Sequence, residues 1–105
     1  MLEITPAKVV QVIYQSREGP GAEPELRAFI AAQNDDEKAH LTAIAWVGRG
    51  SFEPQEFAEA AATARAEATV PTEDYLMEMT DLSENLEAGL EALGIDVTGE
   101  EEDLL

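Results

Sequence analysis

The chain has 105 residues, 45% of them hydrophobic, and its 23 acidic and six basic side chains give a formal net charge of −17. This length predicts one domain with a single core, because it lies close to the commonest domain size. The charge argues against direct binding of nucleic acid or of an anionic membrane surface, and it leaves a basic partner open. The absence of cysteine excludes disulfides, thiol nucleophiles and iron–sulfur ligation by this chain.

The first residues predict a helix start. Residues 1–6 contain an early acid and no long apolar run, so we expect neither a signal peptide nor a membrane span, and a cytoplasmic location. Thr5 offers a capping hydroxyl ahead of Pro6 at the first helical position. Residues 9–14 are rich in β-branched side chains, which also suit a strand. We predict a helix to about Arg17, since no second strand-like run would pair with an isolated strand.

A turn is expected at residues 19–22, which read Gly-Pro-Gly-Ala. Pro24 then opens a second short helix. The spacing of its less polar side chains places four residues on one face: Leu26, Phe29, Ile30 and Gln33.

The segment 41–47 is apolar at every position except Thr42, and it predicts a central helix from about residue 35 to 47. Asn34 and Glu37 have the spacing of a capping box at its start. A helix that is hydrophobic on every side must be surrounded by other elements. Gly48 is interpreted as a left-handed cap that ends this helix, and Gly50 as a turn residue.

The second half of the chain predicts three more helices. The first spans about residues 55–68, the second is short and follows a break at residues 70–72, and the third runs from about Asp81 to Leu93 with Gly94 as its C-cap. Their expected inward faces are formed by Phe57, Ala61, Ala64 and Ala68, then by Tyr75, Leu76 and Met79, and finally by Leu82, Leu86, Leu90 and Leu93.

These elements predict an all-α fold, a compact bundle of five to six short helices around the central helix at about residues 35–47. The domain is expected to span residues 1–94. Residues 95–105 are highly acidic and are expected to form a flexible tail.

Three stretches of the sequence carry a family resemblance: Glu25-Leu26 with Phe29-Ile30, residues 41–46 with Gly48-Arg49-Gly50, and residues 85–90 with Leu93-Gly94. Over about residues 2–94, the chain resembles the small bacterial domains grouped as domain of unknown function 3775. The most specific piece is Trp46 with the Gly-Arg-Gly turn, although Ser51 stands where the resemblance implies an aspartate. The resemblance implies a compact bacterial helical domain and no particular activity.

One candidate site lies at the Gly-Arg-Gly turn. Its residues would be Trp46, Gly48, Arg49, Gly50 and Tyr75. Glycine backbones and the Arg49 guanidinium suit a small anion. The structural interpretation, in which the glycines end the helix and Arg49 bonds exposed carbonyls, explains the same residues and is preferred. Trp46 is expected in the core, with an interface anchor as the alternative, and its indole N–H needs a partner, either a backbone carbonyl or the nearby loop.

No catalytic constellation emerges from the sequence. His40 is the sole histidine, and Asp36 and Glu37 do not share its helix face well enough to form a metal site. Ser51 and Ser83 have no second histidine to activate them. We therefore expect no enzyme activity, no cofactor and no bound metal.

The acids of the C-terminal half form a second candidate site. No lysine or arginine follows Arg65. The proposed acidic face consists of Glu73, Asp74, Glu78, Asp81, Glu84, Glu87 and Glu91. The favoured hypothesis is a non-enzymatic protein-interaction module that uses this face toward an unidentified, basic protein. The alternative is a nucleic-acid mimic that blocks a basic DNA-binding protein, and a small-anion-binding domain ranks third. A monomer is expected, because shared negative charge opposes a homodimer.

Overall fold

The computed structural model describes residues 2–95, and every regular element in that range is helical. The elements in chain order are α1 (Pro6–Arg17), the 3₁₀ turn η1 (Pro20–Ala22), α2 (Glu23–Ala31), α3 (Asp35–Arg49), the 3₁₀ turn η2 (Pro54–Glu56), α4 (Phe57–Ala66), α5 (Thr72–Met77) and α6 (Leu82–Ala92). The predicted all-α fold is confirmed, and residues 9–14 belong to α1 rather than to a strand. The predicted tail, from residue 96 onward, lies outside the described residues.

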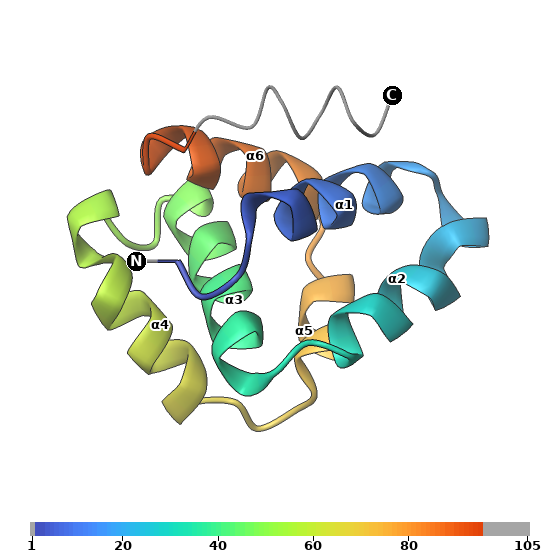
Figure 1. The fold of residues 1–105 in the computed structure, drawn as a ribbon, viewed down its shortest axis with the longest axis horizontal. Coiled ribbons are helices and arrows are strands. Elements are labelled where there is room, and N and C mark those ends of the chain that lie inside the picture. Colours follow the sequence, from blue (N-terminus) through green and yellow to red (C-terminus); the bar gives the residue numbers. More distant parts are fainter. Residues whose placement is uncertain (1, 96–105) are drawn as a thin grey trace.

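Helix α3 occupies the centre of the fold (Figure 1). Helices α1 and α6 lie side by side and cover one end of it, with α6 in direct contact with both α1 and α3. Helix α4 packs along one flank of α3, while α2 and α5 pack together on the opposite flank. This arrangement confirms the prediction that the apolar helix is surrounded by the others.

Two helix starts form as their sequences predict. The Thr5 hydroxyl accepts a hydrogen bond from the backbone N–H of Lys8 at 3.3 Å. At α3, the Asn34 side chain accepts from the Glu37 N–H at 2.8 Å, and the Glu37 carboxylate accepts from the Asn34 N–H at 2.9 Å. Both caps satisfy backbone donors that a helix cannot satisfy internally.

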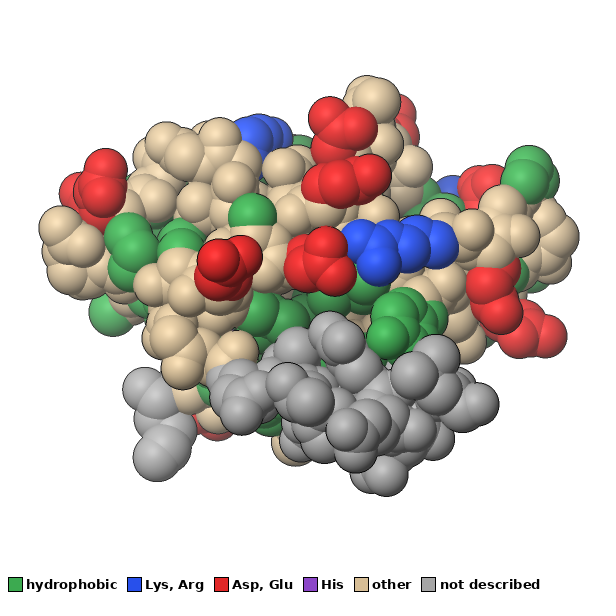
Figure 2. All heavy atoms as spheres, turned by 90° about the horizontal axis from the view of Figure 1, so that it is seen from above, with side chains coloured by type: hydrophobic (Ala, Val, Ile, Leu, Met, Phe, Trp, Pro, Cys, Tyr) green, Lys and Arg blue, Asp and Glu red, His purple; other side chains and the backbone are tan. Residues whose placement is uncertain are grey.

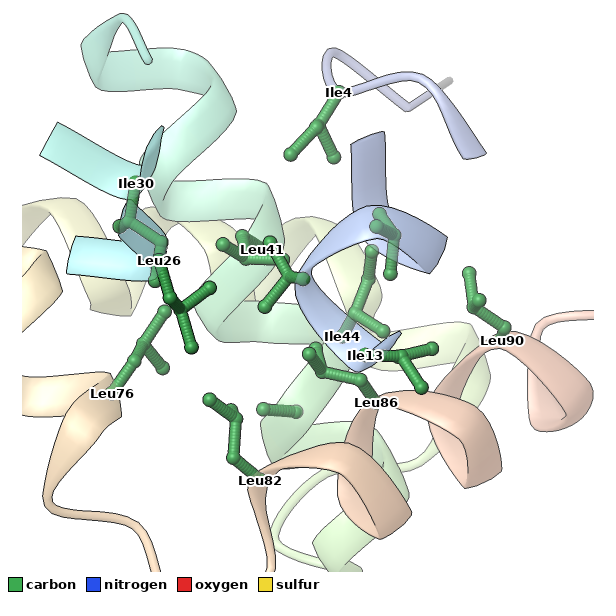
Figure 3. Packing of buried hydrophobic residues seen from close by; sticks show 13 residues of the cluster. Ile4, Ile13, Leu26, Ile30, Leu41, Ile44, Leu76, Leu82, Leu86 and Leu90 are labelled. Carbon is green, nitrogen blue, oxygen red and sulfur yellow. The ribbon is translucent and has the colours of Figure 1, made fainter. Parts of the chain in front are cut away.

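The core gathers branched aliphatic side chains from five helices and from the segment before α1 (Figure 3). Its buried members include Ile4, Val9, Val12, Ile13, Leu26, Ile30, Leu41, Ile44, Leu76, Leu82, Leu86 and Leu90. A smaller cluster of Ala43, Ala60 and Ala61 joins α3 to α4. Small side chains at this second contact let the two helices approach closely.

Helices α3 and α6 cross with their backbones close together, and this crossing depends on two glycines. A methyl group on Gly48 would overlap the carbonyl oxygen of Asn85, and one on Gly89 would overlap the carbonyl oxygen of Ile44. The interpretation of Gly48 as a left-handed cap is therefore wrong. Gly48 is a regular helical residue whose missing side chain makes room for the backbone of α6.

The left-handed residue at the end of α3 is Gly50, with φ +90°. The Gly50 N–H donates to the Val47 carbonyl at 3.1 Å, and the Ser51 N–H donates to the Trp46 carbonyl at 2.9 Å. Helix α6 ends with the same pair of bonds around Gly94, with φ +74°, as predicted for its C-cap. Both ends are Schellman motifs, which close helices on a glycine.

Several predicted boundaries differ from the structure, and α3 continues past the predicted end at residue 47 to Arg49. Helix α4 ends at Ala66, so Ala68 lies outside it and is exposed, and Ala60 with Ala61 forms its buried face. Helix α5 ends at Met77, so Met79 follows it in the link to α6. Ile95, the first position of the predicted tail, packs against the core and donates its N–H to the Leu90 carbonyl.

Candidate functional site

The Trp46 indole joins α3 to α5 at the surface of the core. Its N–H donates to the Tyr75 hydroxyl at 2.9 Å, and the two rings meet edge to face with centroids 6.4 Å apart. Phe52 stacks on the indole with centroids 5.7 Å apart. Trp46 is only partly buried, and its partner is a side chain from α5 rather than the expected backbone carbonyl or nearby loop.

Tyr75 lines two separate hollows. The first, here called the aromatic hollow, has a volume of about 160 Å³ and is lined by Thr42, Trp46, Ala64, Glu67, Ala68, Thr69, Val70, Thr72 and Tyr75. The second, the Arg49 hollow, has a volume of about 540 Å³ and is lined by Arg49, Tyr75, Glu78, Met79, Thr80, Asp81 and Asn85. The structure therefore brings Tyr75 to both Trp46 and Arg49, although Trp46 and Arg49 line different hollows.

The Gly-Arg-Gly corner uses its polar groups within the fold. The amides of Gly50 and Ser51 are bonded to carbonyls at the end of α3, and the Arg49 Nε–H donates to the Ser51 hydroxyl at 3.0 Å. Two carboxylates, Glu78 and Asp81, line the same hollow as Arg49. An anion in this hollow would thus meet more negative than positive charge and would find the two amides engaged.

The predicted acidic face is divided by basic residues from the first half of the chain. Asp74 pairs with Arg27 of α2, and Glu87 pairs with Arg17 of α1 at 3.0 Å. Glu73 is half-buried, and one of its carboxylate oxygens has no hydrogen-bond partner. The α5 acids therefore do not extend the row of exposed acids on α6.

The exposed acids of α6, here called the α6 stripe, are Glu84, Glu87 and Glu91. They lie on the side of the helix opposite the buried Leu82, Leu86 and Leu90, and the helical rise places Glu84 and Glu91 about 10 Å apart. Hydrogen bonds from its own backbone amide and from the Ser83 hydroxyl lower the pKa of Glu84. The face seen in Figure 2 carries acidic side chains separated by uncharged surface, with a basic side chain against one of them.

His40 has a structural environment. Its Nδ1 accepts the backbone N–H of Glu3 at 3.0 Å, and its ring meets Phe57 edge to face at 5.0 Å. Burial lowers the pKa of His40 below its usual 6.5, which keeps Nδ1 free to accept that bond. Among residues 2–95, no group of three or more histidine and acidic side chains is arranged to hold a metal ion.

The two serines considered in the sequence also have local partners. Ser51 accepts from Arg49, and the Ser83 hydroxyl donates to the Glu84 carboxylate at 2.9 Å. Sequence reasoning missed Thr42 and Val70 of the aromatic hollow. Val70 had a signal, because it is an apolar residue in a break between helices, whereas Thr42 offered none beyond being the polar position of α3.

The fold and the site define a small, acidic, all-helical domain. The chain belongs to the family described as protein of unknown function (DUF3775), whose model matches residues 23–95, from the start of α2 to the end of the described chain. No curated protein and no solved structure matches it significantly. None of the helices described is long and apolar enough to cross a membrane.

Proposed function

We propose that this domain is a non-enzymatic interaction module whose α6 stripe binds a basic protein. The observation that carries the proposal is the exposure of Glu84 and Glu91 on one rigid helix, with no cation paired to either within the described residues. Carboxylates placed in this way favour encounter with a positively charged surface.

The rigidity of α6 supports the proposal. The helix is fixed by its leucine face and by the glycine crossing with α3. A preorganised row of charges loses little conformational freedom on binding, which improves affinity for a complementary partner. Most cations of the chain are also engaged by acids other than Glu84 and Glu91, because Lys8, Arg17, Arg27 and Arg65 are each in an ion pair with a different carboxylate.

Nucleic-acid mimicry is the second candidate, and the spacing of Glu84 and Glu91 along one helix row is the observation that favours it. Arg17 sits against the central acid of that row. A mimic depends on an unbroken series of negative charges, so this cation favours the general interaction module.

The test compares the native protein with the double variant Glu84→Gln/Glu91→Gln in affinity capture from a bacterial lysate. The matched control is Glu18→Gln/Glu59→Gln, which removes two exposed acids from α4 and the end of α1. We expect a captured protein that is lost with the α6 variant and in high salt, but kept by the control.

Duplex DNA added to the lysate separates the two candidates. Release of the captured protein by DNA would identify a nucleic-acid mimic. Capture that is equal for both double variants, or no capture at low salt, would contradict a role for the α6 stripe.

A further inference from the structure

We infer that the aromatic hollow binds a compact organic cation, an ammonium group carrying methyl substituents, supplied as a free small molecule. This site is distinct from the α6 stripe and goes beyond the interaction module proposed above. The rings, the charge and the size of the hollow all favour such a ligand.

The rings come from Trp46 and Tyr75. Their planes are nearly perpendicular, at 87°, and both line the hollow, so a group inside it contacts two aromatic systems. Aromatic rings attract cations through their negative faces, and alkylated ammonium ions are the ligands that such paired rings recognise.

The charge comes from Glu67. It is the one charged residue that lines the hollow, and the hydroxyl-bearing and apolar side chains around it carry no formal charge. The whole chain adds a net charge of −17, which raises the concentration of cations near its surface and lowers that of anions.

The two nearby basic residues, Lys38 and Arg65, line an adjoining hollow of about 270 Å³. The adjoining hollow shares four lining residues with the aromatic hollow: Thr42, Ala64, Ala68 and Thr72. Arg65 is paired with Asp36, and Lys38 shares its lining with Asp35. The basic groups therefore have acidic neighbours of their own, while Glu67 faces the aromatic hollow.

The size limits the ligand. A hollow of about 160 Å³ is comparable to cavities that hold a benzene molecule, roughly 150 Å³, and suits a trimethylammonium group. The apolar rim supplied by Ala64, Ala68 and Val70 suits the methyl substituents. Val70 is half exposed, at 50%, which is unusual for a large aliphatic side chain in this fold and leaves it free to contact a ligand.

The experiment titrates the protein with choline and, separately, with 3,3-dimethyl-1-butanol, which has the same shape and no charge. Trp46 is the sole tryptophan, so its fluorescence reports on the hollow directly. Sodium chloride at matched ionic strength removes the contribution of screening. We expect saturable binding of choline and about tenfold weaker binding of the neutral alcohol.

Three variants test the assignment of residues. Glu67→Gln is expected to weaken choline binding about threefold, whereas Glu59→Gln, at an exposed acid within α4, leaves it unchanged. Tyr75→Phe keeps the ring and should bind within about twofold of the native protein, while Tyr75→Leu should bind about tenfold more weakly. Even if Tyr75→Leu fails to fold, Glu67→Gln and Tyr75→Phe still test the site.

Three outcomes would overturn the inference. The first is equal affinity for choline and the neutral alcohol. The second is saturable binding of 3-phenylpropanoate, lost in Lys38→Gln, in place of choline binding. The third is cosedimentation with phosphatidylcholine vesicles that depends on Glu67, which would assign the same chemistry to a lipid headgroup and not to a free ion.

Discussion

At the scale of single residues, the hydrogen bond between Trp46 and Tyr75 couples α3 to α5. Replacement of Tyr75 by phenylalanine removes the acceptor and keeps the ring, so the partly buried indole N–H loses its partner. We expect the free energy of unfolding to fall by about 1 kcal/mol, measured by urea denaturation. Tyr14→Phe is the control, because the Tyr14 hydroxyl makes no hydrogen bond within the described residues. Equal losses in the two variants would contradict a structural role for the bond.

A second prediction concerns His40. Its pKa is lowered in the folded protein, mainly by burial, so below neutral pH the unfolded chain takes up the proton more readily. The contribution of His40 to stability is therefore fully present above the ordinary value of 6.5, and it decreases as the pH falls through that value toward the lowered one. Protonation of Nδ1 also removes the acceptor for Glu3.

His40→Asn keeps an acceptor near the same place and cannot titrate. We expect thermal unfolding of this variant to depend less on pH just below 6.5 than that of the native protein. The pKa values of Glu37 and Glu84 are also lowered, but from 4.5, so their effects begin at a more acidic pH. An unchanged pH dependence in His40→Asn would show that other groups are responsible.

Between helices, the crossing of α3 and α6 leaves no room for a side chain at Gly48 or Gly89. A side chain at Gly89 would meet the backbone of α3, which cannot move without disturbing the core. We expect Gly89→Ala to lower the free energy of unfolding by about 3 kcal/mol, despite the higher helix propensity of alanine. Chemical denaturation would measure this change.

Gly21→Ala is the matched control for that experiment. No atom lies within 4 Å of where its side chain would begin, and its φ is not positive. The control should be nearly neutral or slightly stabilising. A destabilisation no greater for Gly89→Ala than for Gly21→Ala would mean that the crossing relaxes freely.

The same elements show how much of the fold could be predicted from sequence. The caps at Thr5 and Asn34 depend on residues three positions apart, so local sequence was sufficient to predict these helix starts. Segment 41–47 is apolar on every side, so its burial could also be predicted locally. Gly48 was misinterpreted because a glycine near a helix end suits either a left-handed turn or a close contact. The close contact is the correct interpretation because Gly48 meets α6, the helix that contains Gly89. Gly89 is distant in the chain, and no local pattern indicates that the two glycines meet at one crossing.

The candidate site was less predictable for the same reason. Trp46 and Tyr75 were both selected, but the bond between them depends on how α5 packs on α3. The predicted acidic face combined acids of α5 and α6. It is divided by ion pairs that Arg17 and Arg27, which are distant in the sequence, make with two of these acids. A net charge can be counted from a sequence, but the partner of each charge is set by the tertiary fold.

At the scale of the whole molecule, the excess of acids places the folded state under electrostatic repulsion. Exposed ion pairs contribute little each, so screening of repulsion outweighs their loss when salt is added. We expect the thermal unfolding midpoint to rise from low to moderate sodium chloride, measured by circular dichroism.

The variant Glu67→Gln/Glu91→Gln, which removes two exposed acids at or near the carboxyl ends of α4 and α6, provides the comparison for the salt experiment. With two fewer negative charges, it should unfold at a higher temperature in low salt and gain less from added salt. A midpoint that is flat or falls with salt in the native protein would contradict the expected repulsion.

The position of α6 also has a consequence for biosynthesis. Because α6 covers apolar side chains of both α1 and α3, the nascent polypeptide leaves those surfaces uncovered until this late segment has emerged from the ribosome. Native contacts between such distant parts of a chain slow the search for the folded state. During translation, we expect the earlier helices to be prone to aggregation until α6 has been synthesised.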